Sequence, residues 1–193
     1  MQLFVGLGNP GSDYALHRHN VGFMAADTIA DVYRFPPWMK KFKGLISDGR
    51  IGDARILLLK PQTFMNDSGR SVGEAMRFYK LAPGDVTVFY DELDLAPMKV
   101  KVKTGGGAAG HNGIRSIAQH IGEDFRRVRI GIGHPGDKAR VTGYVLGNYA
   151  KAEMEPLADL LGAVAHEAKW LAAGDDARFM SDVALALQTN GKA

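Results

Sequence analysis

A few histidines, asparagines and one aspartate supply the candidate chemistry of this sequence. A histidine beside a carboxylate forms a general-base pair, because the carboxylate fixes the tautomer of the imidazole and stabilises its protonated form. His19 and His111 are the candidate bases, and Asp91 is the candidate carboxylate. The sequence has no cysteine, and neither Ser12 nor Ser68 lies in a G-x-S-x-G elbow. A water molecule activated by histidine is therefore the simplest chemistry that these residues predict.

Three candidate polar residues come at or shortly after the ends of predicted strands. The apolar run Leu3–Leu7 predicts a buried strand, and it stops at a glycine-rich turn that contains Asn9. Asn66 shortly follows a second apolar run, and Asp91 directly follows a third. In open α/β sheets ligands bind beyond the carboxyl ends of the strands, so we expect these three residues to converge on one site.

Strands alternate with helices along the chain. This alternation predicts an α/β fold, a single-domain three-layer sandwich in which a mixed, mostly parallel twisted sheet is flanked by helices. Strands are expected at 3–7, 45–60 (two strands), 86–90, 98–102 and 126–133, and helices at 21–33, 68–80, 114–121 and, from about 151, two more broken at Gly174. The glycine-rich loop 104–113 ends at His111 and Asn112, and we expect it to be a surface lid.

The composition is that of an ordinary globular protein. The 193 residues are 46% hydrophobic and 23% charged. No stretch approaches the ~18 apolar residues of a membrane span, and the first residues lack the basic region of a signal peptide. The absence of cysteine fits a reducing compartment, so we expect a cytoplasmic protein without membrane attachment.

Positive charge is concentrated in one part of the chain. The net charge is only +3, but residues 101–150 carry eight basic and three acidic side chains. Alternate residues of a strand share a face, so the lysines of 99–103 would form one basic row, and Arg127 and Arg129 a second. Two such rows would bind phosphate groups, whereas the alternative is a charged face that is merely solvated.

Other kinds of site are weaker alternatives. Gly6–Gly11 matches the dinucleotide fingerprint G-x-G-x-x-G, but Pro10 removes an N–H donor and no helical pattern begins at Gly11. His17 and His19 could share a metal ion, but no third histidine lies near them and no H-E-x-x-H spacing occurs, so we predict no metal. An RNA-binding module without catalysis would explain the basic residues but not the polar residues at the strand ends.

Several short motifs occur in a fixed order across nearly the whole chain. They are Val5-Gly6-Leu7-Gly8-Asn9-Pro10-Gly11, Tyr14, Arg18-His19-Asn20-x-Gly22, Lys60-Pro61-x-Thr63-Phe64-Met65-Asn66-x-Ser68-Gly69, Asp91-Glu92-Leu93-Asp94-Leu95, Gly105-Gly106-Gly107, Gly110-His111-Asn112-Gly113, Arg129-Ile130-Gly131-Ile132-Gly133 and Tyr144-Val145-Leu146. This ordered set closely resembles the bacterial peptidyl-tRNA hydrolases.

The resemblance implies a monomeric enzyme that needs no metal or cofactor. It would hydrolyse the ester between a peptide and the 3′ end of tRNA, with His19 as the catalytic base and Asp91 as its partner. The residues implied to hold the peptide and the reacting water, or to line their site, are Asn9, Tyr14, Phe64, Met65, Asn66, His111 and Asn112. The basic residues that match positions engaging tRNA phosphate are Lys101, Lys103 and Arg129.

Two positions depart from the pattern of the family that the sequence resembles. His17 stands where a threonine is common, so the resemblance implies a changed proton network beside the site. Ala108-Ala109 replaces a loop segment that is often richer in glycine, histidine or serine. We expect this second difference to affect the mobility of the lid and its contact with tRNA.

Overall fold

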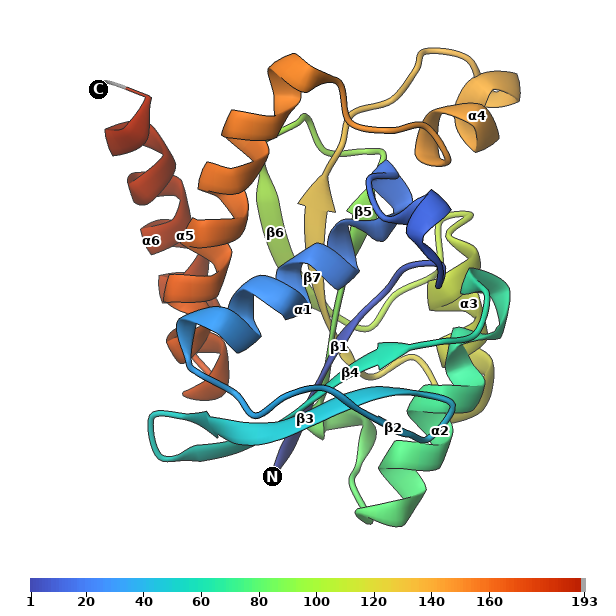
Figure 1. Cartoon of the computed structure of the whole chain (residues 1–193), viewed down its shortest axis with the longest axis vertical. Coiled ribbons are helices and arrows are strands. Elements are labelled where there is room, and N and C mark those ends of the chain that lie inside the picture. The colour runs from blue at the N-terminus through green and yellow to red at the C-terminus, as the bar shows by residue number, and fades with distance from the viewer. Residues whose placement is uncertain (192–193) are drawn as a thin grey trace.

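The computed structural model describes residues 1–191, and in that part of the chain seven strands form one sheet (Figure 1). The strands are β1 (Gln2–Gly6), β2 (Met39–Lys41), β3 (Gly44–Ile51), β4 (Ala54–Pro61), β5 (Val86–Glu92), β6 (Val100–Thr104) and β7 (Arg126–Gly131). The helices are α1 (Val21–Val32), α2 (Ser68–Phe78), α3 (Asn112–Ile121), α4 (Val141–Val145), α5 (Met154–Ala172) and α6 (Asp176–Asn190). The 3₁₀ turns η2 (Arg18–Asn20) and η3 (Met65–Asp67) lead into α1 and α2.

The sheet is mixed, as the sequence predicts, but it is not mostly parallel, because three of its strand pairings within residues 1–191 are parallel and three are antiparallel. Its order is β2-β3-β4-β1-β5-β7-β6. The central strands β4, β1, β5 and β7 pair in parallel, whereas β2, β3 and β6 add antiparallel pairings at the two edges. Parallel strands are normally covered on both faces, and the central strands here have helices on each side.

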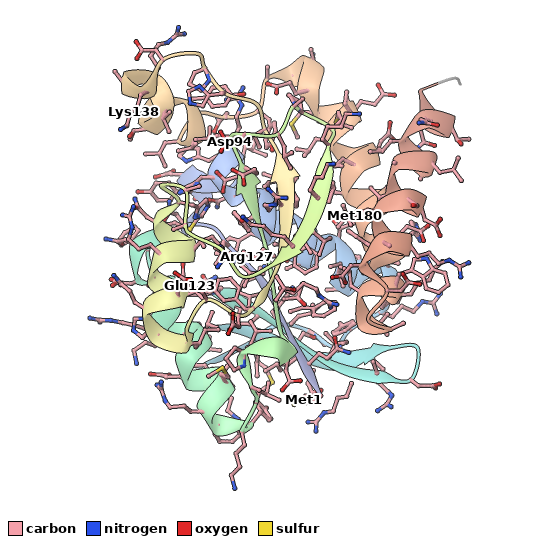
Figure 2. The ribbon with its side chains drawn as sticks, turned by 180° about the vertical axis from the view of Figure 1, so that it is seen from behind. Met1, Asp94, Glu123, Arg127, Lys138 and Met180 are labelled. Carbon is pink, nitrogen blue, oxygen red and sulfur yellow. The ribbon has the colours of Figure 1, made fainter. Side chains whose placement is uncertain are left out.

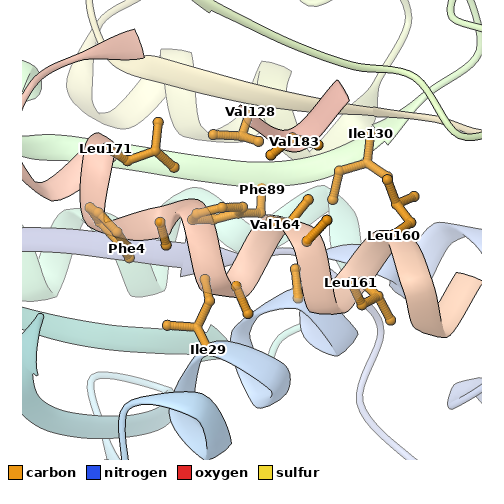
Figure 3. Close-up of a cluster of buried hydrophobic side chains, with 14 of the residues drawn as sticks. Phe4, Ile29, Phe89, Val128, Ile130, Leu160, Leu161, Val164, Leu171 and Val183 are labelled. Carbon is orange, nitrogen blue, oxygen red and sulfur yellow. The ribbon is translucent and has the colours of Figure 1, made fainter. Parts of the chain in front are cut away.

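Each face of the sheet has its own hydrophobic core, because successive side chains of a strand point to opposite faces. Phe4 on β1 and Phe89 on β5 pack against α1, α5 and α6 (Figure 3). Leu3 and Val5, which flank Phe4 on β1, pack instead with residues of α2 and α3. The three-layer sandwich expected from the sequence is therefore confirmed.

The strand order creates a crevice at one edge of the sheet. Strand β1 lies between β4 and β5, and all three run in the same direction, so their carboxyl ends meet. Helix α1 approaches this edge closely because Gly22 has no side chain, and a Cβ there would collide with the backbone of Leu7 and Phe89. This close approach places η2, and with it His19, at the end of β1.

Some details of the fold differ from the sequence-based expectation. Within residues 1–191, β2 and α4 are the short elements for which no strand or helix was expected, because neither is long enough to give a periodic pattern. Strand β6 begins at Val100, two residues later than expected. A 3₁₀ turn follows Gly11 and no α-helix begins there, so the nucleotide fingerprint lacks its helix. None of the helices in the described part of the chain is long and apolar enough to cross a membrane.

Candidate active site

A cleft of about 710 Å³ opens at the carboxyl edge of β1, β4 and β5. One side carries the polar residues of the strand ends, and the other is formed by α4 and the segment before it. Figure 2 labels one residue on each side, Asp94 after β5 and Lys138 before α4. The sequence-predicted residues that line the cleft are Asn9, His19, Phe64, Met65, Asn66, Asp91, His111 and Asn112.

Asp91 lies between two imidazoles on the floor of this cleft. His19 Nδ1 is 2.8 Å from Asp91 Oδ2, and His111 Nε2 is 2.8 Å from Asp91 Oδ1. The Asp91 side chain is only 1% exposed, and those of His19 and His111 are 11% and 9% exposed. The structure thus brings His19 to Asp91, and it adds His111 from the glycine-rich loop as a second partner of the same carboxylate.

When both imidazoles are neutral, their hydrogen bonds to Asp91 require opposite tautomers in His19 and His111. A carboxylate only accepts hydrogen bonds, so the protons lie on His19 Nδ1 and His111 Nε2. His111 Nδ1 accepts the N–H groups of Gly113 and Ile114, at 3.1 and 3.3 Å, and thereby caps α3. His19 Nε2 has no hydrogen-bond partner among residues 1–191. Of the two, His19 therefore keeps a free nitrogen lone pair for accepting a proton.

The carboxyl group of Asp91 stays ionised. Burial by itself would raise its pKa, but the charges and hydrogen bonds of His111 and His19 outweigh burial and hold the pKa well below its usual range. Burial also raises the pKa of Tyr90 to about 12, so the phenol remains neutral. The Tyr90 ring packs edge-on against His111, with the centroids 5.0 Å apart.

Asn9 is fixed by Asn20, a residue to which the sequence analysis assigned no role. The Asn9 backbone N–H donates to Asn20 Oδ1, and Asn20 Nδ2 donates to the Asn9 carbonyl, both at 2.9 Å. Asn9 Oδ1 accepts the backbone N–H of Met65 at 2.7 Å. The Asn9 amide N–H groups are therefore the part of this side chain that is left for a ligand. Asn20 follows His19 directly in the sequence, and this adjacency was the available signal.

The other two asparagines are more exposed. Asn66 lies in η3 and Asn112 begins α3, and both line the cleft. Asn112 Oδ1 accepts a hydrogen bond from Arg115 Nη1 at 3.1 Å, which leaves its amide N–H groups unused. Neutral amides from three different elements therefore surround the two histidines.

The predicted wall residues are only partly in the cleft. Met65 is buried at its edge, and Phe64 lines it with 60% of its surface exposed. Tyr14 is not among the residues that line the cleft. Its ring packs edge-on against Phe64 and His17, with centroid distances of 6.5 and 5.3 Å. Tyr14 therefore does not line the cleft itself but packs against Phe64, which does.

Arg18 joins His19 to the opposite wall, an interaction that the sequence analysis did not identify. Its guanidinium lies over the rings of Tyr144 and Tyr149, 4.4 and 5.6 Å from their centroids. It also donates to the Asn148 carbonyl at 3.1 Å and to Glu153 Oε1 at 2.9 Å. These contacts hold η2 against the segment that follows α4.

The basic patch, as it is called below, consists of Lys101 and Lys103 on the edge strand β6 and of Arg129 on the neighbouring strand β7. Lys101 pairs in register with Arg129 across β6 and β7. Arg129 Nη1 is 3.8 Å from Glu92 Oε1, and Glu92 lines the cleft. Among residues 1–191, no carboxylate lies within salt-bridge distance of Lys101 or Lys103. The patch therefore adjoins the cleft, and most of its positive charge has no nearby negative charge.

The second basic row expected from the sequence, formed by Arg127 and Arg129, is wrong for Arg127. Arg127 alternates with Val128 as predicted, but it is completely buried, so it cannot contact tRNA phosphate. Its guanidinium is covered by the glycine-rich loop, whose carbonyl groups it contacts. Of the two arginines in the expected row, only Arg129 belongs to the basic patch.

The two departures from the family pattern have different surroundings. The backbone of His17 forms an isolated antiparallel β-bridge with Asn148, and its ring packs on Tyr14. The ring therefore lies outside the hydrogen-bond network of Asp91. Ala108 packs against the core beneath α3, whereas Ala109 adopts a left-handed conformation with φ of 48°. Such a backbone is unfavourable for alanine and suits glycine better. The effect of either departure on activity stays a prediction.

The same cluster contains the candidate metal ligands of the described residues. Donor atoms of His19, Asp91 and His111 all lie within 4.8 Å of one another. His17, the alternative metal ligand beside His19 in the sequence, is not among them. The nitrogens that face Asp91 carry the protons of two hydrogen bonds, so a metal ion could bind there only by displacing both.

Comparison with known proteins gives consistent matches along the chain. The sequence model of the family described as peptidyl-tRNA hydrolase matches residues 3–191. A peptidyl-tRNA hydrolase of Sphingopyxis alaskensis is 77% identical over 188 residues, covering 97% of this chain and 100% of that protein. A peptidyl-tRNA hydrolase of Rhizorhabdus wittichii is 74% identical, covering 97% of this chain and 99% of that protein. The crystal structure of the peptidyl-tRNA hydrolase of Acinetobacter baumannii, 42% identical, has a TM-score of 0.89 and covers 95% of this chain and 94% of that one.

Proposed function

The chain belongs to the peptidyl-tRNA hydrolase family, and from that premise we propose how its cleft carries out the reaction. The enzyme hydrolyses the ester that joins a peptide to the 3′ end of tRNA. One observation carries the proposed mechanism. His19 lines the cleft with Nε2 unpartnered among the described residues, while Asp91 holds its Nδ1 at 2.8 Å.

In this mechanism His19 is the general base. Nε2 takes a proton from a water molecule as the water oxygen attacks the ester carbonyl carbon. The negative charge of Asp91 stabilises the imidazolium that forms. The bond to the ribose oxygen then breaks, and the imidazolium returns the proton to that oxygen. The peptide leaves with a new carboxylic acid, and the tRNA leaves with its 3′-hydroxyl restored.

The three asparagines hold the substrate and the attacking water. The oxygens of Asn9 and Asn112 already accept hydrogen bonds from the protein, so their amide N–H groups remain as donors. Such donors can bind peptide carbonyl groups whatever the side chains of the peptide. The same donors can stabilise the negative charge that develops on the ester oxygen, because fixed dipoles need no reorganisation. Asn66 supplies further hydrogen bonds from the side of β4.

The basic patch binds the phosphate groups of the tRNA body. Its support is the register of Lys101 with Arg129 and the absence of nearby carboxylates for the two lysines in the described residues. Phosphate contacts of this kind do not depend on sequence and release counterions. The patch therefore contributes affinity for many different tRNAs, while the cleft recognises the ester.

The test is the release of the acyl group from an N-acetylated aminoacyl-tRNA. The enzyme is first stripped with a chelator and then assayed in a magnesium buffer that keeps the tRNA folded. We expect repeated turnover that added zinc or cobalt ions do not increase. Activity that is lost on stripping and restored only by a transition metal would contradict the proposed metal-free mechanism.

A further inference from the structure

Arg127 is a buried cation that the proposed mechanism does not use. It lies on β7, where Figure 2 labels it, and its side chain is completely buried. Among residues 1–191, no carboxylate lies within salt-bridge distance of its guanidinium, and its Nε has no hydrogen-bond partner. Removing a charge from water without an opposite charge is costly. Its hydrogen bonds must therefore offset much of that cost.

Two of the carbonyl partners of Arg127 belong to the glycine-rich loop. Its Nη1 donates to the Gly107 carbonyl and its Nη2 to the Gly106 carbonyl, both at 2.6 Å. Its Nη2 also donates to the Glu123 carbonyl at 3.2 Å. A guanidinium is a rigid, planar fork, so two bonds to successive carbonyls fix both the position and the direction of this short backbone segment.

The fixed carbonyls lie just before the residues that complete the active site. The Ala108 carbonyl, next along the chain, accepts the backbone N–H of His111 at 2.9 Å. His111 then donates to Asp91, and its other ring nitrogen caps α3. The loop is thus held at its start by Arg127 and at its end by the cap of α3, with the hydrogen bond to Asp91 at that end.

We propose that Arg127 is a positioning residue for the reaction. Through the carbonyls of Gly106 and Gly107 it fixes the path of the glycine-rich loop, and so holds His111 on Asp91 and Asn112 in the cleft. The inference rests on the proposed function of that cluster. It predicts that a change at Arg127 alters the chemical step although the residue touches neither substrate nor the reacting atoms.

Arg126 provides a matched control for this inference. It precedes Arg127 on β7 but points to the opposite side, where it donates to the Leu171 carbonyl at 2.7 Å and pairs with Asp176 at 3.0 Å. Both guanidinium groups thus donate to backbone carbonyls of other segments, that of Arg126 to one carbonyl and that of Arg127 to three. Only those of Arg127 lead to the catalytic loop, so loss of stability and loss of loop position can be separated.

The first experiment compares Arg127→Lys with Arg126→Lys in the full-length enzyme. Lysine cannot donate to both carbonyls in the same geometry, so we expect kcat on N-acetylated aminoacyl-tRNA to fall by roughly 10–10²-fold for Arg127→Lys. KM should change little, and the Nε2–H resonance of His111 in NMR spectra should exchange faster or disappear. Arg126→Lys should lower the melting temperature but keep both kcat and this resonance. Equal behaviour of the two variants would overturn the inference.

The second experiment changes the loop and leaves Arg127 in place. Gly106 has a φ of 97°, and a Cβ there would lie 3.1 Å from Lys103 Nζ, so Gly106→Ala should displace its carbonyl. Gly107 has open space and no such backbone restriction, so Gly107→Ala should not. Both glycines are exposed, so we expect both alanine variants to fold. We expect only Gly106→Ala to lower kcat and to weaken the His111 resonance.

The outcomes separate this inference from the proposed function. If Gly106→Ala and Arg127→Lys fold and retain full kcat with an unchanged His111 resonance, Arg127 does not position the loop. If the resonance is lost while kcat is unchanged, the loop has moved without consequence, and the positioning role is equally wrong. If instead the wild-type enzyme works but His19 proves dispensable, the proposed mechanism fails on its own, and the His111 resonance still reports on the loop.

Discussion

The His19–Asp91–His111 cluster and the basic patch lie at the same edge of the sheet but are built in opposite ways. The Asp91 side chain is 1% exposed, and each of its oxygens accepts one imidazole N–H at 2.8 Å. In the patch, Lys101 is exposed, and Arg129 Nη1 lies 3.8 Å from the carboxylate of Glu92. The cluster has one permitted arrangement, whereas the lysines of the patch can adapt to a ligand.

This difference separates two tasks. A general base must face the reacting atoms in one tautomer, so its surroundings are buried and every hydrogen bond is assigned. Binding to phosphates of variable position needs mobile positive charge at the surface. There each ion pair adds a similar increment of binding affinity. Changes in the cluster should therefore act on kcat and be large, and changes in the patch should act on KM and depend on salt.

The largest effect is expected for His19→Ala. Loss of the general base should lower kcat by roughly 10²–10⁴-fold, while binding of deacylated tRNA and the melting temperature stay close to wild type. His17→Ala is the matched control, because the ring of His17 packs on Tyr14 outside the Asp91 network. A His19→Ala enzyme with near-normal turnover would remove His19 as the base.

Asp91→Asn should have the next largest effect on the cluster. The imidazole of His19 remains, so we expect a smaller loss of kcat than for His19→Ala, roughly 10–10²-fold. The loss arises because an amide has one oxygen and one N–H₂ group, and cannot accept from both His19 and His111. Steady-state kinetics of the two variants side by side provide the measurement. A greater loss for Asp91→Asn would mean that the carboxylate does more than orient and stabilise the base.

Replacement of Lys101, Lys103 and Arg129 by alanine should affect binding rather than chemistry. We expect KM to rise for the tRNA substrate but not for a minimal ester without the tRNA body. The slope of log affinity against log salt should fall by about 1 for each phosphate interaction that the substitutions remove. Lys40→Ala with Lys41→Ala, on the opposite edge strand β2, is the control that should leave the slope unchanged. If the triple variant keeps the wild-type slope, the patch is only a solvated face.

The smallest effect is expected in the loop that links the two regions. Ala109 has a φ of 48°, so Ala109→Gly should relieve strain that outweighs the added freedom of the unfolded chain. We expect the free energy of unfolding in denaturant titrations to rise by about 0.5 kcal/mol, with kcat within about twofold of wild type. Ala108→Gly, which removes a side chain packed on the core, should instead lower the free energy of unfolding. A destabilised Ala109→Gly variant would show that this alanine is not strained.

Much of the cleft at the carboxyl ends of the strands could be predicted from the sequence because it depends on local patterns. The apolar runs before Asn9 and Asp91 place both residues near strand ends, although β5 continues through Glu92, and parallel strands bring such ends together. The hydrophobic periodicity of α1 and α5 likewise predicts helices that cover a sheet, and both pack on one face. The ordered motifs then identify the family across residues 3–191.

What could not be predicted depends on long-range packing. Arg127 and Arg129 occupy equivalent positions in an alternating pattern, yet the first is completely buried and the second is not. The difference arises because the glycine-rich loop folds back over Arg127, and strand periodicity carries no information about that loop. The hydrogen bond between His111 and Asp91 could not be predicted for the same reason. His111 lies on a loop 20 residues away in the sequence, and the path of that loop is set by long-range packing.

The most direct test of the account is the protonation of the two histidines in the resting enzyme. Long-range ¹H–¹⁵N NMR correlations of the ring nitrogens distinguish the tautomers at a pH where the imidazoles are neutral. We expect a proton on Nδ1 of His19 and on Nε2 of His111, with His19→Ala and His111→Asn providing the assignments. A proton on His19 Nε2 would contradict this expectation, because that nitrogen could not then accept a proton from the attacking water.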